Sequence, residues 1–271
     1  MKTRIISGLI LIPIVIFFLA KGGVYLQGAI LFLSLVGMYE FYRAMHKTFQ
    51  PLHLLGYGCA LIYLIFAQFF INADNMFNIL VSVFLVLLLA AMVIFHNRVM
   101  VQDIFVTFFG FFYVCFLLSH IYLVREYAYG QFFVWLIFIS AFGCDTGAYF
   151  TGMLFGKHKL IPSLSPKKTI EGAIGGVVVG TLLAVLFGLS VETMFQLDEV
   201  NTVLLCFVTG IVGSILSQIG DLAASAIKRS VGIKDYGTLI PGHGGVLDRF
   251  DSVMFTAPAV YYIMLFLIEV L

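Results

Sequence analysis

The chain is a succession of long apolar runs separated by short polar segments. A membrane-spanning helix needs about 20 mostly apolar residues, and these runs approach that length with few charges inside them. By run length we predict nine membrane helices, at residues 4–20, 25–45, 52–71, 76–95, 103–124, 131–152, 170–190, 200–220 and 248–270. We expect the eighth to continue into water as a polar helix to about residue 230. The pattern predicts an all-α polytopic membrane protein with about nine transmembrane helices.

Composition excludes a large soluble domain. Of the 271 residues, 62% are hydrophobic and 11% are charged, with a mean hydropathy of +1.08. A soluble protein is roughly half apolar and about a quarter charged. The four cysteines lie in apolar segments without CxxC spacing, which is typical of small buried side chains. We therefore expect membrane lipids, and no nucleic acid, as partners.

The basic residues are distributed asymmetrically among the predicted loops. Cytoplasmic loops of membrane proteins are enriched in Lys and Arg. If the N-terminus is cytoplasmic, 13 of the 15 basic residues fall on the cytoplasmic side, and only Lys21 and Arg125 fall outside. We therefore predict a multi-pass protein of a bacterial-type inner (plasma) membrane, with its N-terminus and large polar loops in the cytoplasm and its C-terminus outside.

Polar residues are unevenly divided along the chain. The first five predicted spans are almost purely apolar, whereas glycine and charged residues accumulate from Asp145 onward. We predict an N-terminal apolar region at residues 1–130 and a C-terminal catalytic region at 131–271.

The densest cluster of charge lies between the last two predicted spans. Two lysines, two arginines, one histidine and three aspartates occur within residues 225–251. Asp221, Ser225 and Lys228 are spaced i, i+4 and i+7, which places them on one face of a helix. Charge is costly beside a membrane helix, so this segment is a candidate functional site.

Two features of this segment indicate metal and phosphate chemistry. Asp248 and Asp251 stand at i and i+3 where the last helix begins, and a divalent cation relieves the repulsion between such carboxylates. Oxygen ligands suit Mg²⁺, which bridges carboxylates to phosphates. Three glycines free the backbone to approach an anion; they are Gly242, Gly244 and Gly245.

A second polar cluster precedes the seventh predicted span. Lys167 and Lys168 are followed by Thr169, a candidate N-cap, with Glu171 in the first helical turn. The lysines suit either binding of anionic lipid and membrane topology, or a clamp for a triphosphate or lipid phosphate that faces the first cluster. The next glycines recur every four residues, which favours close helix packing; they are Gly172, Gly176 and Gly180.

Asp145 lies inside the sixth predicted span. A carboxylate in a membrane helix is expensive and usually functional. We interpret it as a polar-cavity residue that binds metal or substrate or pairs with a lysine.

The run from Ser225 to Asp251 resembles the signature of the phosphatidate cytidylyltransferase family, and residues 165–172 and Asp145 also look like that family. The signature positions are Ser225, Ile227, Lys228, Arg229, Lys234, Asp235, Gly237, Ile240, Pro241, His243, Gly244, Gly245, Val246, Asp248, Arg249, Phe250 and Asp251. The resemblance implies transfer of CMP from CTP to phosphatidic acid, giving CDP-diacylglycerol and pyrophosphate. It further implies a homodimer and a metal site on aspartates near Asp221.

We assign roles as a hypothesis. Asp221, Asp248 and Asp251 would bind Mg²⁺, and a second cation is left open. The catalytic set would hold the triphosphate and the lipid phosphate, with His243 donating a hydrogen bond; it comprises Asp221, Lys228, Arg229, Lys234, Asp235, His243, Asp248 and Arg249. Further substrate contacts are expected from Lys167, Lys168, Ser225, Gly244, Gly245 and Asp145.

Two other classes of protein fit parts of the pattern. An ion-coupled transporter could use Asp145 and Asp221 as a coupling site, but the sequence has no inverted repeat and its charges gather at one membrane face. A polyprenol or phytol kinase would share this broad layout.

Overall fold

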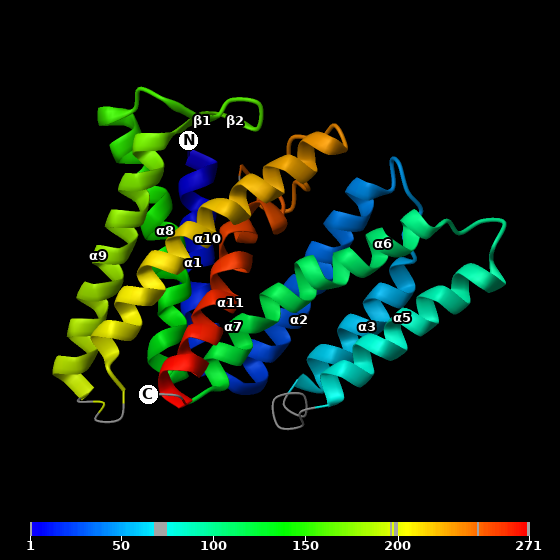
Figure 1. Ribbon diagram of the computed structural model, residues 1–271, viewed down its shortest axis with the longest axis horizontal. Coiled ribbons are helices and arrows are strands. Elements are labelled where there is room, and N and C mark those ends of the chain that lie inside the picture. Colours follow the sequence, from blue (N-terminus) through cyan, green and yellow to red (C-terminus); the bar gives the residue numbers. More distant parts are fainter. Residues whose placement is uncertain (1, 68–74, 196, 198–199, 243, 270–271) are drawn as a thin grey trace. The chain divides into compact units, whose positions relative to one another are not determined.

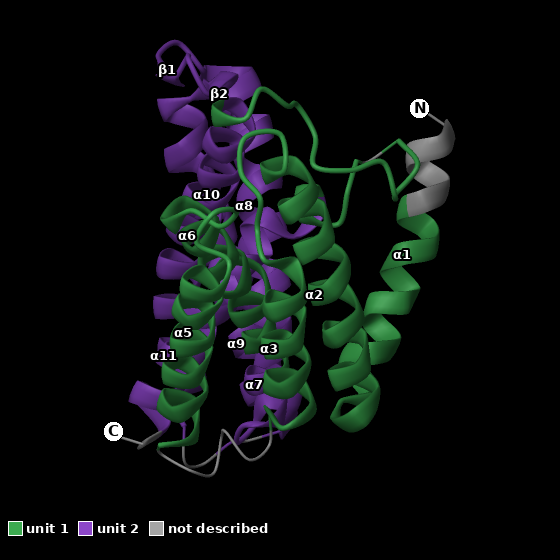
Figure 2. Cartoon of the chain, turned by 90° about the vertical axis from the view of Figure 1, so that its right-hand side faces the viewer, with its two compact units in different colours: residues 1–122, 230–248 green, residues 123–229, 249–271 purple. Residues whose placement is uncertain are grey.

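The structure is a computed structural model that describes residues 2–67, 75–195, 197, 200–242 and 244–269. The chain forms two compact units. Unit 1 contains residues 1–122 and 230–248, and unit 2 contains residues 123–229 and 249–271 (Figure 2). The segment 230–248 therefore packs with the N-terminal helices rather than with its neighbours in sequence.

Unit 1 is helical (Figure 1). Its elements are α1 (Lys2–Lys21), α2 (Gly23–Met45), α3 (His53–Ile65), α5 (Met76–Ile94), α6 (Val101–Gly110), the π-helix η1 (Phe111–Phe116) and the first part of α7 (Leu117–Glu126). Buried aromatic side chains form much of its core. The Tyr42 hydroxyl donates to the Thr107 carbonyl at 2.8 Å, and a Cβ at Gly110 would lie 2.9 Å from Tyr42 Cζ. Glycine is thus needed at position 110, where the Tyr42 ring from α2 packs against α6.

Unit 2 contains four long helices and a small hairpin. The helices are α8 (Gly130–Phe155), α9 (Ile170–Phe195), α10 (Thr202–Ser230) and α11 (Leu247–Glu269). Strands β1 (Lys159–Ile161) and β2 (Ser165–Thr169) pair antiparallel between α8 and α9, with Lys159 opposite Thr169 and Ile161 opposite Ser165. In Figure 1 the hairpin lies at one end of the α8–α9 pair. It leads directly into the first turn of α9.

Glycines allow the helices of unit 2 to approach closely. A Cβ at Gly172 would lie 2.8 Å from the Ala148 carbonyl oxygen, and one at Gly176 would lie 2.8 Å from that of Cys144. The predicted packing role of the glycine repeat is confirmed. Gly210 makes a similar approach to α9, and Gly220 to α11.

The observed helices match the predicted spans with two local differences. Within the described residues, seven helices are long and apolar enough to cross a membrane, and two shorter apolar helices lie at Gly8–Lys21 and His53–Ile65. The fifth predicted span is observed as one continuous helical segment, Val101–Glu126, which contains the π-helix η1. The hairpin at 159–169 was not predicted. α10 continues to Ser230, as expected.

Candidate active site

An ion pair joins the two charged clusters within unit 2. Lys168 Nζ on β2 pairs with Asp221 Oδ2 on α10, with both side chains partly exposed. Lys168 thus lies beside Asp221, one helical turn before Ser225, and its predicted part in a phosphate clamp stays a prediction. Lys167, its neighbour on β2, is exposed.

Asp145 and Asp251 belong to the same electrostatic environment. The Asp145 carboxylate on α8 interacts electrostatically with Asp221 and with Lys168. Asp251, buried on α11, also interacts with Asp221. Three helices thus contribute carboxylates that interact with one another, and Lys168, Arg249 and Lys228 add positive charge nearby.

The donor set in unit 2 fits a hard divalent cation. Its oxygens come from Asp145, Asp221 and Asp251, whose like charges oppose one another. Among the described residues, no group of three or more His, Cys, Asp or Glu is arranged to hold a metal ion. Mg²⁺ usually keeps several waters and takes only one or two carboxylates together with substrate phosphates. A preformed site with three protein ligands is therefore not required for Mg²⁺ to bind.

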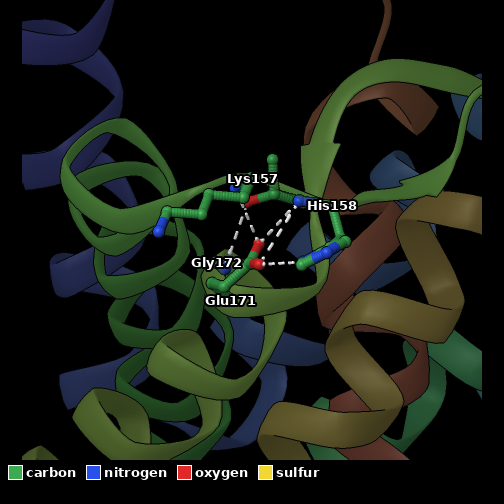
Figure 3. Close-up of polar contacts among 5 residues, drawn as sticks. Lys157, His158, Glu171 and Gly172 are labelled. Carbon is green, nitrogen blue, oxygen red and sulfur yellow. Dashed lines mark hydrogen bonds and ion pairs between the residues drawn. The ribbon is translucent and has the colours of Figure 1, made fainter.

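The hairpin is fastened to the start of α9 by Glu171. Its carboxylate accepts from the backbone N–H of Lys157 at 3.1 Å and of His158 at 3.2 Å, and it contacts His158 Nδ1 at 2.6 Å (Figure 3). Thr169 Oγ1 accepts from the Gly172 N–H at 3.1 Å, which confirms the predicted N-cap. These bonds fix the strand that carries Lys168.

Gln218 is a polar residue of this site that the sequence reasoning missed. It lies on α10, and its Nε2 donates to the Ala173 carbonyl on α9 at 3.0 Å. It also contacts Cys144 Sγ on α8 at 3.2 Å. It thus ties three helices together less than one turn before Asp221. Its position within an apolar run was the available signal.

In unit 1, Asp248 is turned back onto the preceding loop. Its Oδ2 accepts from the backbone N–H of Tyr236 at 2.8 Å and of Gly245 at 3.0 Å. The Ile240 N–H donates to the Gly244 carbonyl at 2.9 Å, and Gly244 has a φ of 87°, which favours glycine. Asp248 therefore has a structural role in addition to the predicted role in metal binding.

Glu40 and Arg43 on α2 also hold this loop, and the sequence reasoning missed both. The Glu40 carboxylate accepts from the N–H groups of Val246 at 3.1 Å and Leu247 at 3.0 Å. Arg43 Nη2 donates to the Tyr236 carbonyl at 3.2 Å. Two ionisable residues near the end of an apolar span were the signal that could have found them.

The remaining predicted site residues are divided between the units. Ser225 and Lys228 share a stripe of α10 with Asp221, and Arg229 is exposed near the helix end. Lys234 and Asp235 are exposed in unit 1, whereas Arg249 is exposed at the start of α11 in unit 2. His243 lies outside the described residues. The catalytic and substrate-binding roles of this set stay predictions.

Comparison with known proteins places the chain in a family. A family model described as the cytidylyltransferase family matches residues 2–267. The chain belongs to the cytidylyltransferase family. Similar proteins include the phosphatidate cytidylyltransferases of Bacillus subtilis (strain 168), 31% identical over 97% of both chains, and of Staphylococcus aureus (strain COL), 32% identical over 95% of this chain and 96% of the relative. That of Staphylococcus epidermidis (strain ATCC 12228) is 34% identical over 95% of this chain and 96% of the relative.

The charged side chains of unit 2 suit this cytidylyltransferase to binding phosphate groups close to one another. Transfer between phosphates requires positioning and charge stabilisation more than covalent help from the protein. In unit 2, lysine and arginine side chains interact with a group of acidic side chains. The site therefore places positively charged side chains beside carboxylate oxygens.

Proposed function

We propose that this protein transfers CMP from CTP to phosphatidic acid, which yields CDP-diacylglycerol and pyrophosphate for phospholipid synthesis. The observation that carries the proposal is the similarity over nearly the whole chain to phosphatidate cytidylyltransferases. The charge of the site supports it, because both substrates are polyanions. The apolar helices support it too, because phosphatidic acid stays in the bilayer.

In the proposed reaction, a phosphate oxygen of phosphatidic acid attacks the α-phosphorus of CTP in line. A new P–O bond forms as the bond to the β-phosphate breaks, and pyrophosphate leaves with the electron pair. A phosphomonoester has a second pKa of about 6, so the nucleophile is largely dianionic at neutral pH. The reaction therefore requires no general base. Lys168, Lys228 and Arg249 would orient the phosphates and stabilise the leaving charge.

We propose that Asp221 and Asp251 hold Mg²⁺, with Asp145 close by in the same unit. Bound Mg²⁺ would supply neutralisation of phosphate charge. Lys168 would leave Asp221 for a phosphate oxygen when substrate binds. This exchange is supported by the partial exposure of both partners, 28% and 31%, which leaves them accessible to solutes.

The proposal is tested with purified protein in detergent by following pyrophosphate release and lipid products. Release that requires CTP, phosphatidic acid and Mg²⁺ together, with CDP-diacylglycerol as co-product, is the expected result. Chelation of Mg²⁺ by EDTA should abolish it, and added Mg²⁺ should restore it. Formation of CDP in place of pyrophosphate would indicate a lipid kinase and contradict the proposal.

We further propose that the protein lies in a bacterial-type inner membrane, with its N-terminus and active site cytoplasmic and its C-terminus outside. The asymmetry of basic residues supports this orientation. The proposed working form is a homodimer. A detergent-corrected molar mass of one chain, measured for an active sample by light scattering, would contradict the dimer.

A further inference from the structure

Glu40 is a buried carboxylate that accepts hydrogen bonds from backbone N–H groups 206 and 207 residues away in the chain. Its side chain is 3% exposed and accepts from Val246 and Leu247. A buried charge is costly unless hydrogen bonds compensate for it. These two N–H groups lie where α11 begins, and the start of a helix favours negative charge. The arrangement gives both Glu40 oxygens a backbone donor.

Two signature glycines make room for this carboxylate. A Cβ at Gly237 would lie 2.9 Å from Glu40 Cδ, and one at Gly245 would collide with both Glu40 carboxylate oxygens. Neither glycine has positive φ, unlike Gly244. Space for Glu40, rather than backbone conformation, is therefore the reason that the structure gives for glycine at these two positions.

Two further hydrogen bonds hold the same loop at the Tyr236 backbone. Arg43, one turn after Glu40, donates to the Tyr236 carbonyl, and Asp248 accepts from the Tyr236 N–H. Tyr236, Val246 and Leu247 are all buried. The loop is thus anchored at both ends, while Lys234 and Asp235 just before it remain exposed.

We propose that Glu40 is a positioning residue for the proposed cytidylyltransfer: its carboxylate fixes the described parts of the loop, 236–242 and 244–248, by binding the Val246 and Leu247 N–H groups between Gly237 and Gly245. The inference rests on the proposed function for its kinetic consequence. The contact between Glu40 and the loop does not depend on the proposed function. Glu40 acts through the loop and needs no contact with either substrate.

The first test compares Glu40→Gln with wild type. Gln keeps the size of the side chain but replaces one acceptor oxygen with an NH₂ group, so one N–H group loses its partner. Hydrogen exchange in the peptide containing Val246 and Leu247 should accelerate about tenfold or more, and kcat per folded molecule should fall by a similar factor. KM for CTP should change less than kcat, because the loop positions groups that act in the transition state. Glu192→Gln, at an exposed site on α9, is the matched control and should match wild type in each measurement.

The second test uses the glycine. Gly245→Ala should lower kcat strongly, because the added methyl group meets the Glu40 carboxylate. In Glu40→Asp/Gly245→Ala the shorter side chain withdraws by one methylene, and kcat should recover several-fold over Gly245→Ala. If Glu40→Gln does not accumulate in folded form, Glu40→Asp replaces it in the first test, with a smaller loss expected.

Three outcomes would overturn the inference. They are wild-type exchange and kcat in the Glu40 variant, a loss of activity fully accounted for by a smaller folded fraction, and a double variant no better than Gly245→Ala. Failure of the wild-type protein to make CDP-diacylglycerol would instead refute the proposed function. The exchange measurement would still test the loop contact in that case.

Discussion

At the scale of single residues, the ion pair of Lys168 and Asp221 joins the hairpin to α10 within unit 2. Lys168 comes from a hairpin and Asp221 from a membrane helix, and each is about a third exposed or less. Exposed ion pairs contribute little to stability. A lysine that gives up little when it leaves its carboxylate is suited to exchanging that partner for a phosphate.

This pair gives a matched comparison on one strand. Lys168→Gln should lower kcat/KM about tenfold or more, because it removes the cation paired with Asp221 and offered to phosphate. Lys167→Gln removes an equal charge from an exposed neighbour and should cost less. Steady-state kinetics at fixed ionic strength measures both. A larger loss for Lys167→Gln would contradict the assignment.

Sequence patterns singled out charged residues that the structure brings together in unit 2, but they did not show how each is held. Asp221, Lys168 and Asp145 were found because charge stands out in an apolar chain. Glu40 was overlooked because its position near a helix end resembles an ordinary boundary residue. Its partners are 206 and 207 residues away, and periodicity carries no information on such separations.

At the scale of elements, glycine-lined helix contacts hold unit 2 together. α8 and α9 approach so closely at Gly172 and Gly176 that a Cβ would meet backbone carbonyl oxygens. Lipid provides no hydrophobic drive between helices, so close van der Waals packing has to supply the association. These contacts position the helices that carry Asp145 and the hairpin.

Substituting alanine for glycine at two positions distinguishes the effect of helix packing on stability from the effect of helix propensity. Gly176→Ala should destabilise the protein by about 1–3 kcal/mol, because the methyl group has no space beside α8. Gly28→Ala on α2 meets nothing within 4 Å and should leave stability equal or higher. Thermal unfolding in one detergent compares them. Equal melting temperatures for the two variants would exclude the packing role.

Long apolar helices were predictable, whereas short irregular elements were not. A membrane span is a one-dimensional signal that run length captures. The hairpin at 159–169 depends on Glu171 bonding back to His158, and the π-helix within Val101–Glu126 leaves no mark on hydropathy. The same limit applies to the 230–248 segment, which packs with distant helices.

At the scale of the whole molecule, the proposed orientation assigns the lysine hairpin and the end of α9 to opposite sides of the membrane. Ser163 lies at the exposed hairpin turn, and Glu192 is exposed near the far end of α9. Ser163 precedes α9 and Glu192 lies in its last turn, so the two positions are at opposite ends of one predicted span. They therefore report orientation directly.

Cysteine labelling in intact cells tests this orientation. Glu192→Cys should react with a membrane-impermeant maleimide from outside, and Ser163→Cys should react only after permeabilisation. The four native cysteines are buried, so the unmodified protein serves as the background control. The reverse pattern of labelling would invert the proposed topology.

The length of α10 has a consequence for how the two substrates meet. Its 29 residues extend about 44 Å at about 1.5 Å per residue, more than the roughly 30 Å of a bilayer interior. Asp221 and Arg229, eight residues apart on this helix, differ by about 12 Å along its axis. α10 thus carries charge at two positions along its axis, and in the proposed topology these two positions would lie at different depths relative to the membrane surface. Inserting a helical turn between them would change this vertical offset without removing any charge.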